Sequence, residues 1–243
     1  MQEPVVELSN VRFRWSAAAP FVVDIESLQI AKARHILLRG PSGSGKSTLL
    51  SLLAGVITPQ QGTIRVLGQE IGGLSGAARD RFRADHIGFI FQMFNLIPYL
   101  SVIDNVCLPC GFSQRRRSRA MRSGGTAEAE AVRLLGHLEM ADAGVLRRPV
   151  TDLSVGQQQR VAAARALIGA PELVIADEPT SSLDADRRSA FLDLLFRECA
   201  RERTTLIFVS HDASLAPLFD REISFAAINS SLPQRAALAE STR

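Results

Sequence analysis

The chain has 243 residues, 46% of them apolar, and its 28 basic and 25 acidic residues give a formal net charge of +3. This near balance argues against a general nucleic-acid binder, and no apolar run approaches the roughly 18 residues that a membrane-spanning helix needs. The first ten residues, MQEPVVELSN, have neither a basic start nor an apolar signal core, so we expect a cytoplasmic protein.

Strand-like segments occupy the first 40 residues. VVELSNVRF (5–13) and FVVDIESLQI (21–30) carry branched apolar residues at near-alternate positions, and ILLRG follows at 36–40. Such alternation is typical of half-buried strands. The series continues with TIRVLG (63–68) and HIGFIFQ (86–92), and RDRFRAD between them predicts a short charged helix or loop.

A helical stretch then interrupts the strands from about residue 93 to residue 170. Its apolar residues recur at three- and four-residue spacing, as in AEAEAVRLLGHLEM (127–140), which predicts amphipathic helices. Strand character returns in LVIAD (173–177) and TLIFVS (205–210), separated by the helical pattern DRRSAFLDLLFRECAR. Strands that alternate with helices favour an α/β fold with a mainly parallel sheet.

Two features of the helical stretch have ordinary interpretations. SQRRRSRAMRSGG (113–125) is a charge run, which indicates a solvated loop more often than a binding site; a membrane-facing role is the alternative. Cys107 and Cys110 form a C-x-x-C, but Cys199 is the only other cysteine. We therefore interpret the pair as apolar residues in a buried helix turn rather than as a redox pair or half of a zinc site.

The clearest chemical motif is a glycine-rich turn between the strand ILLR and a helix that we expect to begin at Lys46. GPSGSGKS satisfies G-x-x-x-x-G-K-[ST], in which consecutive backbone N–H groups and the helix N-terminus surround a phosphate. Lys46 would bring a charge to the β- and γ-phosphates of ATP, and Ser47 could ligate Mg²⁺. The residues predicted to bind nucleotide here are Gly40, Pro41, Ser42, Gly43, Ser44, Gly45, Lys46, Ser47 and Thr48.

Polar residues follow three other strands. Asp177 ends LVIAD and is predicted to hold Mg²⁺, while Glu178, one residue on, is predicted to polarise the water that attacks the γ-phosphate. Gln92 closes HIGFIFQ and His211 follows TLIFVS. We expect all four side chains at the strand-end edge where the phosphates bind.

A second glycine-containing helix start, LSVGQQQRV, lies at 153–161. Ser154 is a good N-cap for the helix VGQQQRVAAARALIG, which leaves Ser154 and the Gly156 backbone at an end suited to phosphate. One chain rarely needs two such ends. With this segment, the order GPSGSGKST, Gln92, LSVGQQQR, LVIADEP, SSLD (181–184), His211 resembles the ATP-binding subunits of ABC transporters over nearly the whole chain.

The resemblance implies a P-loop α/β fold with a mainly parallel core sheet, an N-terminal antiparallel β-subdomain and an inserted helical subdomain. We expect a single ABC ATP-binding domain over 1–243. Its core ATPase lobe would cover about 1–92 and 171–225, its helical subdomain about 93–170 and its C-terminal tail about 226–243.

The resemblance also implies an ATPase that works as a head-to-tail homodimer, with ATP and Mg²⁺ as cofactors. Ser154, Gly156 and Gln157 of one subunit would cap the ATP held by the other, and ATP binding would close the dimer while hydrolysis reopens it. Lys46, Gln92, Glu178 and His211 would be catalytic, and Ser47, Gln92 and Asp177 would hold the metal. Trp15, preferred over Phe13, would stack on adenine, and Asp184 would lie at the dimer interface.

Within the family, FQMFNLIPYLSVIDNVCLP and GQEIGGLS look most like the lipoprotein-release and macrolide-exporter branch. The resemblance implies a partner permease and a position on the inner face of the cell membrane. Met93, Phe94, Leu96 and Ile97 are the expected permease contacts; a buried hydrophobic turn is the competing interpretation.

Two departures from the family pattern bear on these expectations. Val155 replaces a usual glycine and would crowd the partner's ATP, although Ser154 and Gly156 stay in register. REISFAAINSS (221–231) lacks the usual Asp-Gly hairpin turn, so we do not expect residues 225–243 to dock firmly.

Two other functions remain open at this point. A regulatory ATPase of the same branch would move no substrate and would instead act through a permease-like partner on cell-envelope enzymes. A soluble DNA-repair or translation ATPase is disfavoured, because those usually carry a long coiled coil or two ATPase units, and no nucleic-acid partner is expected.

Overall fold

A computed structural model describes residues 4–140, 142–181 and 183–232. The chain divides into two compact units, one made of residues 1–80 and 207–243 and the other of residues 81–206. The proposed division into lobes at about 92, 170 and 225 follows the family pattern and stays a prediction.

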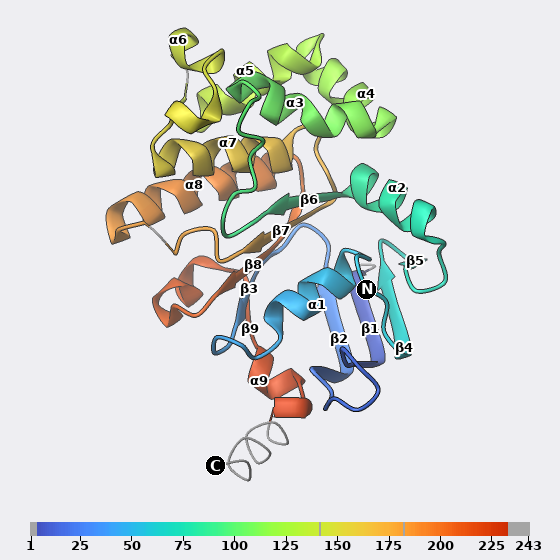
Figure 1. Cartoon of the computed structure of the whole chain (residues 1–243). Coiled ribbons are helices and arrows are strands. Elements are labelled where there is room, and N and C mark those ends of the chain that lie inside the picture. The colour runs from blue at the N-terminus through green and yellow to red at the C-terminus, as the bar shows by residue number, and fades with distance from the viewer. Residues whose placement is uncertain (1–3, 141, 182, 233–243) are drawn as a thin grey trace. The chain divides into compact units, whose positions relative to one another are not determined.

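The first unit begins with an antiparallel sheet in the order β2-β1-β4-β5. Its strands are β1 (Pro4–Phe13), β2 (Val23–Ala31), β4 (Gln61–Val66) and β5 (Gln69–Glu70). Val6, Leu8 and Val11 of β1 are buried, and the alternation of buried and exposed positions is interrupted between Leu8 and Val11, where the register with β4 shifts. Figure 1 shows β1 beside β2 and β4, as their registers require. This sheet is the predicted N-terminal antiparallel subdomain.

The same unit contains parallel strand pairing. β3 (His35–Arg39) pairs in parallel with β9 (Arg221–Ser224), and β8 (Thr205–Ser210) lies on the other side of β3. β3 and β8 are almost wholly buried, which explains their continuous apolar sequences. α1 (Lys46–Leu53), the 3₁₀ segment Ala213–Leu218 and α9 (Phe225–Ile228) complete the unit.

The start of the C-terminal segment packs more firmly than the sequence predicted. Phe225, Asn229 and Ser231 are buried, and the Asn229 side chain accepts a hydrogen bond from the Asp24 N–H (2.8 Å) and donates one to the Val22 carbonyl (3.0 Å). The expectation of loose docking was therefore wrong for residues 225–232, because side-chain amide contacts replace the missing hairpin turn. Residues 233–243 lie outside the described residues.

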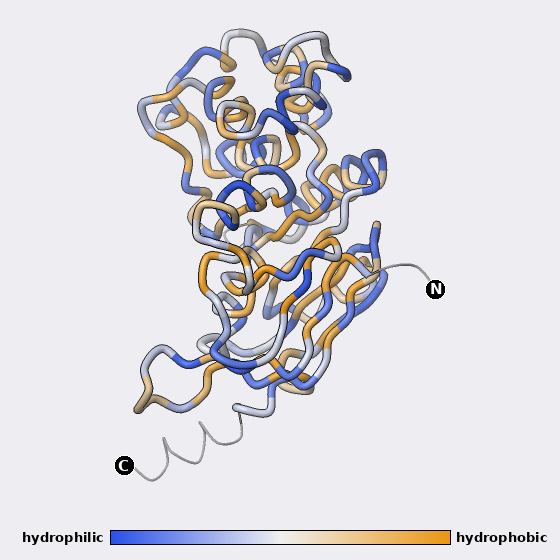
Figure 2. Tube along the Cα trace, turned by 90° about the vertical axis from the view of Figure 1, so that its right-hand side faces the viewer, coloured by the Kyte–Doolittle hydropathy of each residue, from blue (hydrophilic) through white to orange (hydrophobic). Residues whose placement is uncertain are grey.

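The second unit is mainly helical around a parallel pair, β6 (Ile87–Ile90) with β7 (Leu173–Asp177). Its helices are α3 (Val102–Phe112), α4 (Gln114–Gly124), α5 (Ala127–His137), α6 (Ala143–Leu146), α7 (Val155–Leu167) and α8 (Ala185–Arg201), with a 3₁₀ turn at Val150–Asp152. α2 (Gly76–His86) contains the boundary between the units. In Figure 2, hydrophobic and hydrophilic stretches interleave along these helices, as amphipathic packing requires.

α7 is the central helix of the second unit. It contacts α3, α5, α8 and β6, and Val161 to Ala164 are fully buried. A Cβ at Gly88 of β6 would lie 2.2 Å from the Ala166 carbonyl oxygen, so only glycine allows this helix to approach the strand so closely. The C-terminal half of α7 is thereby fixed against the sheet.

Candidate functional site

The glycine-rich turn connects the buried strand β3 to α1, as its sequence predicted. Gly43 and Gly45 have φ of 72° and 109°, in the left-handed region that favours glycine. A Cβ at Gly45 would lie 2.9 Å from the Val22 Cγ1 and 3.0 Å from the Val22 carbonyl oxygen. The turn therefore needs glycine at this position for both conformation and space.

The donors of this loop suit the oxygens of a polyphosphate. Lys46 is only 5% exposed, and its ammonium donates to the carbonyls of Gly40 and Pro41, both at 2.8 Å. The Ser44 Oγ is buried and has no hydrogen-bond partner among the residues that the structure describes. α1 starts at Lys46 without a side-chain cap. A buried cation, an unsatisfied hydroxyl and an uncapped helix start are together a fit for phosphate.

Two further predicted residues belong to the same unit. Trp15 is 63% exposed, whereas Phe13 is buried in phase with β1. The Phe13 ring meets the Trp15 ring edge-on, with centroids 5.0 Å apart and planes at 89°. Trp15 thus has a supported ring with free surface for a planar ligand. His211 directly follows β8 and is exposed.

The predicted carboxylates and Gln92 belong to the second unit. Asp177 is the last residue of β7 and Glu178 the next, and both are part-exposed. Glu178 has a φ of 45°, an unfavourable conformation for a residue with a Cβ that occurs disproportionately at functional positions. Gln92 lies exposed two residues after the end of β6. These three residues thus lie at or just beyond the C-terminal ends of two adjacent parallel strands.

The second helix start has the predicted N-cap. The Ser154 Oγ accepts from the Gln157 N–H (3.4 Å), and the Gln157 Oε1 accepts from the Ser154 N–H (2.9 Å), which is a capping box. Val155 is 50% exposed. An added Cβ at Gly156 would meet no atom within 4 Å, so packing within the chain does not explain this glycine. The Gln157 side chain is already engaged in the cap.

Asp184 is the N-cap of α8. Its carboxylate accepts from the Arg187 N–H at 2.9 Å and lies 3.3 Å from the Arg187 Nε. The side chain is exposed. Asp184 therefore shapes the start of its own helix and remains available at the surface.

The four residues predicted to contact a permease differ in exposure. Met93 is 81% exposed, Leu96 and Ile97 are part-exposed, and Phe94 is only 8% exposed. Phe94 and Asn95 have positive φ values of 59° and 48°. The segment thus combines an exposed apolar residue with a buried anchor.

The arginine-rich segment was interpreted wrongly from sequence. It is the helix α4, and Arg116 is buried rather than solvated. The Arg116 guanidinium donates to the carbonyls of Ile168 (2.8 Å) and Ala166 (2.6 Å) at the C-terminal end of α7. Arg119 bonds to the Ala170 carbonyl and to the Glu172 carboxylate. Unsatisfied helix-end carbonyls explain why arginines are placed here.

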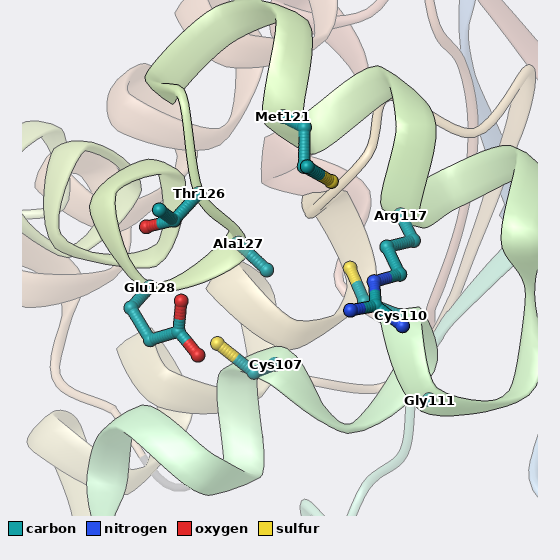
Figure 3. Close-up of a pocket in the computed structure, with 8 residues that line it drawn as sticks. All are labelled: Cys107, Cys110, Gly111, Arg117, Met121, Thr126, Ala127 and Glu128. Atoms are coloured by element: carbon teal, nitrogen blue, oxygen red, sulfur yellow. The ribbon is translucent and has the colours of Figure 1, made fainter.

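The C-x-x-C pair lines a cavity of about 330 Å³ among α3, α4 and α5. Cys110 is buried, Cys107 is part-exposed, and both are free thiols in a helix, consistent with their interpretation as packing residues. Figure 3 shows the Cys107 sulfur on the Glu128 side of the cavity and the Cys110 sulfur beside Arg117. Burial raises the pKa of the Cys107 thiol to about 12. Among the described residues, no group of three His, Cys, Asp or Glu side chains could hold a metal ion.

The predicted residues therefore fall into two sets. The first unit holds the P loop (40–48), Trp15 and His211. The second holds Gln92, Asp177 and Glu178 together with the capped start of α7 and Asp184. Sequence reasoning missed Arg116 and Arg165, whose contacts join segments far apart in the chain. Arg116 lies in the charge run that the sequence assigned to a solvated loop, and Arg165 lies in an ordinary helical pattern, so no local signal marked either one as buried.

Comparisons with known proteins agree with the motifs. Residues 23–181 match the family model described as ABC transporter. The chain is 39% identical over 218 residues to the lipoprotein-releasing system ATP-binding protein LolD 2 of Rhodospirillum rubrum, covering 89% of this chain and 91% of that protein. It is 37% identical over 225 residues to the macrolide export ATP-binding/permease protein MacB 1 of Aeromonas hydrophila, covering 92% of this chain but 33% of that protein.

A solved structure shows the same architecture. The dimeric post-hydrolysis state of the ATP-binding cassette MJ0796 bound to ADP and Pi aligns with a TM-score of 0.76 and 32% identity, covering 90% of this chain and 93% of that one. Among the described residues, no helix has the length and apolar character needed to cross a membrane. The chain belongs to the ATP-binding proteins of the ABC transporter family and is an ATPase.

Proposed function

We propose that this chain is the ATPase subunit of a membrane permease in the lipoprotein-release and macrolide-export branch, and that it works as a head-to-tail homodimer. The proposal of a dimer rests on the structure at the start of α7. Ser154 and Gly156 lie at a capped helix N-terminus, and Gly156 has open space where a side chain would be. Glycine lowers helix stability relative to alanine, so its presence is best explained by a ligand that must approach the backbone.

The P loop would hold the triphosphate of ATP. Backbone N–H groups from Gly40 to Thr48 would surround the β-phosphate, and Lys46 would move its ammonium from the loop carbonyls to the β- and γ-phosphate oxygens. The buried Ser44 hydroxyl would gain the partner that it lacks. Trp15 would stack on the adenine ring, supported by Phe13.

Mg²⁺ would be held by the Ser47 hydroxyl, the Gln92 side chain and Asp177. These are oxygen ligands of the kind that Mg²⁺ prefers, and the metal would neutralise charge that develops on the phosphates. Glu178 would accept the proton of the attacking water, Gln92 would orient that water, and His211 would hydrogen-bond to the γ-phosphate.

The second ATP-binding surface would come from the partner subunit in the dimer. The α7 N-terminus, with Ser154 and the Gly156 backbone, would donate hydrogen bonds to the γ-phosphate bound by the other copy. Asp184 would lie near that interface. Because the γ-phosphate bridges the two copies, ATP would hold the dimer closed and hydrolysis would release it.

The permease would bind the segment that follows Gln92. Met93 offers an exposed apolar side chain, Leu96 and Ile97 add part-exposed surface, and Phe94 would anchor the segment from within. The chain would therefore be peripheral on the inner face of the cell membrane. The likeness to LolD over nearly the full length of both chains supports a separate permease chain, whereas MacB 1 is named as an ATP-binding/permease protein.

The role of Glu178 is tested by Glu178→Gln. The variant should bind ATP with unchanged affinity, hydrolyse it at least about 100-fold more slowly and elute as a closed dimer in ATP, because the phosphate cradle is intact. Turnover at the wild-type rate would exclude Glu178 as the base.

The shared site is tested by mixing two inactive chains, Lys46→Ala and Ser154→Arg. Heterodimers would contain one composite site with an intact P loop and an intact α7 start, so the mixture should hydrolyse ATP faster than either variant alone. Activity no higher than the sum of the two would contradict a site shared between copies.

The permease is tested by purification from detergent-solubilised membranes. An integral membrane protein should copurify with the wild-type chain, and Met93→Glu should reduce its recovery without changing the ATPase rate of the isolated chain. Recovery of nucleic acid in place of a membrane protein would contradict the proposal. If the purified pair moves no substrate in vesicles, the regulatory function of the same branch is favoured.

A further inference from the structure

Arg165 of α7 holds the segment that follows Gln92. Its guanidinium donates from Nη1 to the Asn95 carbonyl at 2.7 Å and from Nη2 to the Phe94 carbonyl at 2.5 Å. The arginine is buried, and burial lowers the pKa of its guanidinium. Two adjacent carbonyls are thus bound by the two ends of one planar fork, a contact that lysine cannot reproduce.

The segment that receives these bonds has an unfavourable backbone. Phe94 and Asn95 both have positive φ, and the Asn95 N–H donates to the Met93 carbonyl at 2.6 Å. Asparagine enters the left-handed region more readily than other residues with a Cβ, but a bulky residue such as Phe94 is uncommon there and needs surroundings that hold it. The Arg165 fork and the burial of Phe94 supply that enforcement.

The other end of this contact is anchored by hydrogen bonds and close packing. The C-terminal carbonyls of α7 are bound by Arg116, and the helix lies against Gly88 of β6. Arg165 lies ten residues after Val155, which corresponds to roughly 15 Å along the helix axis. The loop at 94 and 95 is therefore connected to the helix that begins after Ser154 through one buried side chain, and Arg165 fixes the loop relative to that helix.

We propose that Arg165 is a positioning residue that couples the two ATP sites of the dimer. This inference rests on the proposed function, in which Gln92 serves the ATP bound by its own chain and Ser154 serves the ATP bound by the partner. Arg165 joins the segments that carry these two residues within one chain. Through this contact the state of one ATP site depends on the geometry of the other ATP site. Arg165 itself does not touch nucleotide.

The test uses heterodimers with a single live site. One chain carries Lys46→Ala; the live site then consists of the other chain's P loop and Gln92 and of the Lys46→Ala chain's Ser154. Arg165→Gln is placed in either chain in turn. It should lower kcat at least five-fold in both placements and leave KM for ATP within two-fold, because the P loop is unchanged.

Three control substitutions show whether this dependence on placement is specific to Arg165. Ser154→Arg should act only when it is in the Lys46→Ala chain, and Gln92→Ala only when it is in the other chain. Arg160→Gln is the matched substitution on the same helix, where the arginine pairs with Glu139 at the surface, and it should act in neither placement. An effect of Arg165→Gln in one placement alone would overturn the coupling, since Arg165 would then support either the Gln92 segment or the Ser154 segment and not both.

Failure of the proposed function has a different signature. If Ser154→Arg shows no dependence on placement, the shared site is wrong, and this is seen without any Arg165 variant. Hydrogen exchange then tests the contact in the single chain. The amides of residues 94–97 should exchange at least ten-fold faster in Arg165→Gln and at the wild-type rate in Arg160→Gln; unchanged exchange in Arg165→Gln would refute the positioning role.

Discussion

The substitution Arg116→Met tests whether a buried charge stabilises the second unit. Arg116 is 3% exposed and donates to the carbonyls of Ile168 (2.8 Å), Ala166 (2.6 Å) and Arg165 (3.3 Å). Methionine keeps an unbranched apolar stem and removes every donor. The result depends on whether the lost hydrogen bonds outweigh the relief of burying a charge.

The two effects can be compared in magnitude. Burial lowers the pKa of the Arg116 guanidinium from 12.5 to about 10, which corresponds to a cost of about 3 kcal/mol for the charged form. The two short charge-assisted bonds contribute roughly 3–6 kcal/mol together, and the helix C-terminus adds up to about 1 kcal/mol. The bonds prevail, so Arg116→Met should lower the free energy of unfolding by about 2 kcal/mol.

Urea unfolding followed by circular dichroism measures this difference as a shift of the midpoint at constant slope. Arg117→Met is the matched control, because Arg117 is the next residue of α4 and is exposed. It should change the free energy of unfolding by no more than about 0.5 kcal/mol. Equal stability of the two variants would refute the stabilising role of the buried arginine.

Three further predictions concern other residues. Burial would raise the pKa of Glu172, but hydrogen bonds from His86, Arg115 and Arg119 outweigh it and hold that pKa well below its ordinary 4.5. The stability that Glu172 contributes is therefore lost as the pH falls below about 4.5. Glu172→Gln should make stability, measured by thermal unfolding, depend less on pH in the acid range, and an unchanged dependence would contradict this. Gly156→Ala should raise the melting temperature, because alanine favours the helix and its methyl group meets no atom within 4 Å. The same substitution should lower the ATPase rate at least about ten-fold, and retained activity would count against the approach of a ligand to this glycine. Asn229→Ala should cost roughly 1–2 kcal/mol in urea unfolding, since it removes the partner of the part-buried Asp24 N–H and one of the two hydrogen bonds to the Val22 carbonyl, which keeps the one from Ser231. A neutral result would mean that residues 225–232 dock without it.

Local sequence determined the parts of this protein whose partners are close along the chain. The P loop needs only a strand, glycines in left-handed conformations and a helix start, and all three are encoded within 36–53. The capping box at Ser154 depends on a residue three positions later. Most of the strands and helices followed from apolar spacing, because one buried face is enough to set the period. The arginine-rich helix α4 was the exception.

Only the tertiary structure decided the roles of residues whose partners are distant in sequence. Arg116 bonds to carbonyls about 50 residues away, Arg165 to carbonyls 70 and 71 residues away, and Asn229 to backbone more than 200 residues away. Phe94 is buried in a segment whose sequence predicts exposure as readily as burial. From sequence alone, a charged or polar side chain is assigned to solvent unless its hydrogen-bond acceptors are known. Unpaired backbone carbonyls at helix ends and in strained loops cannot be read from the pattern of residues.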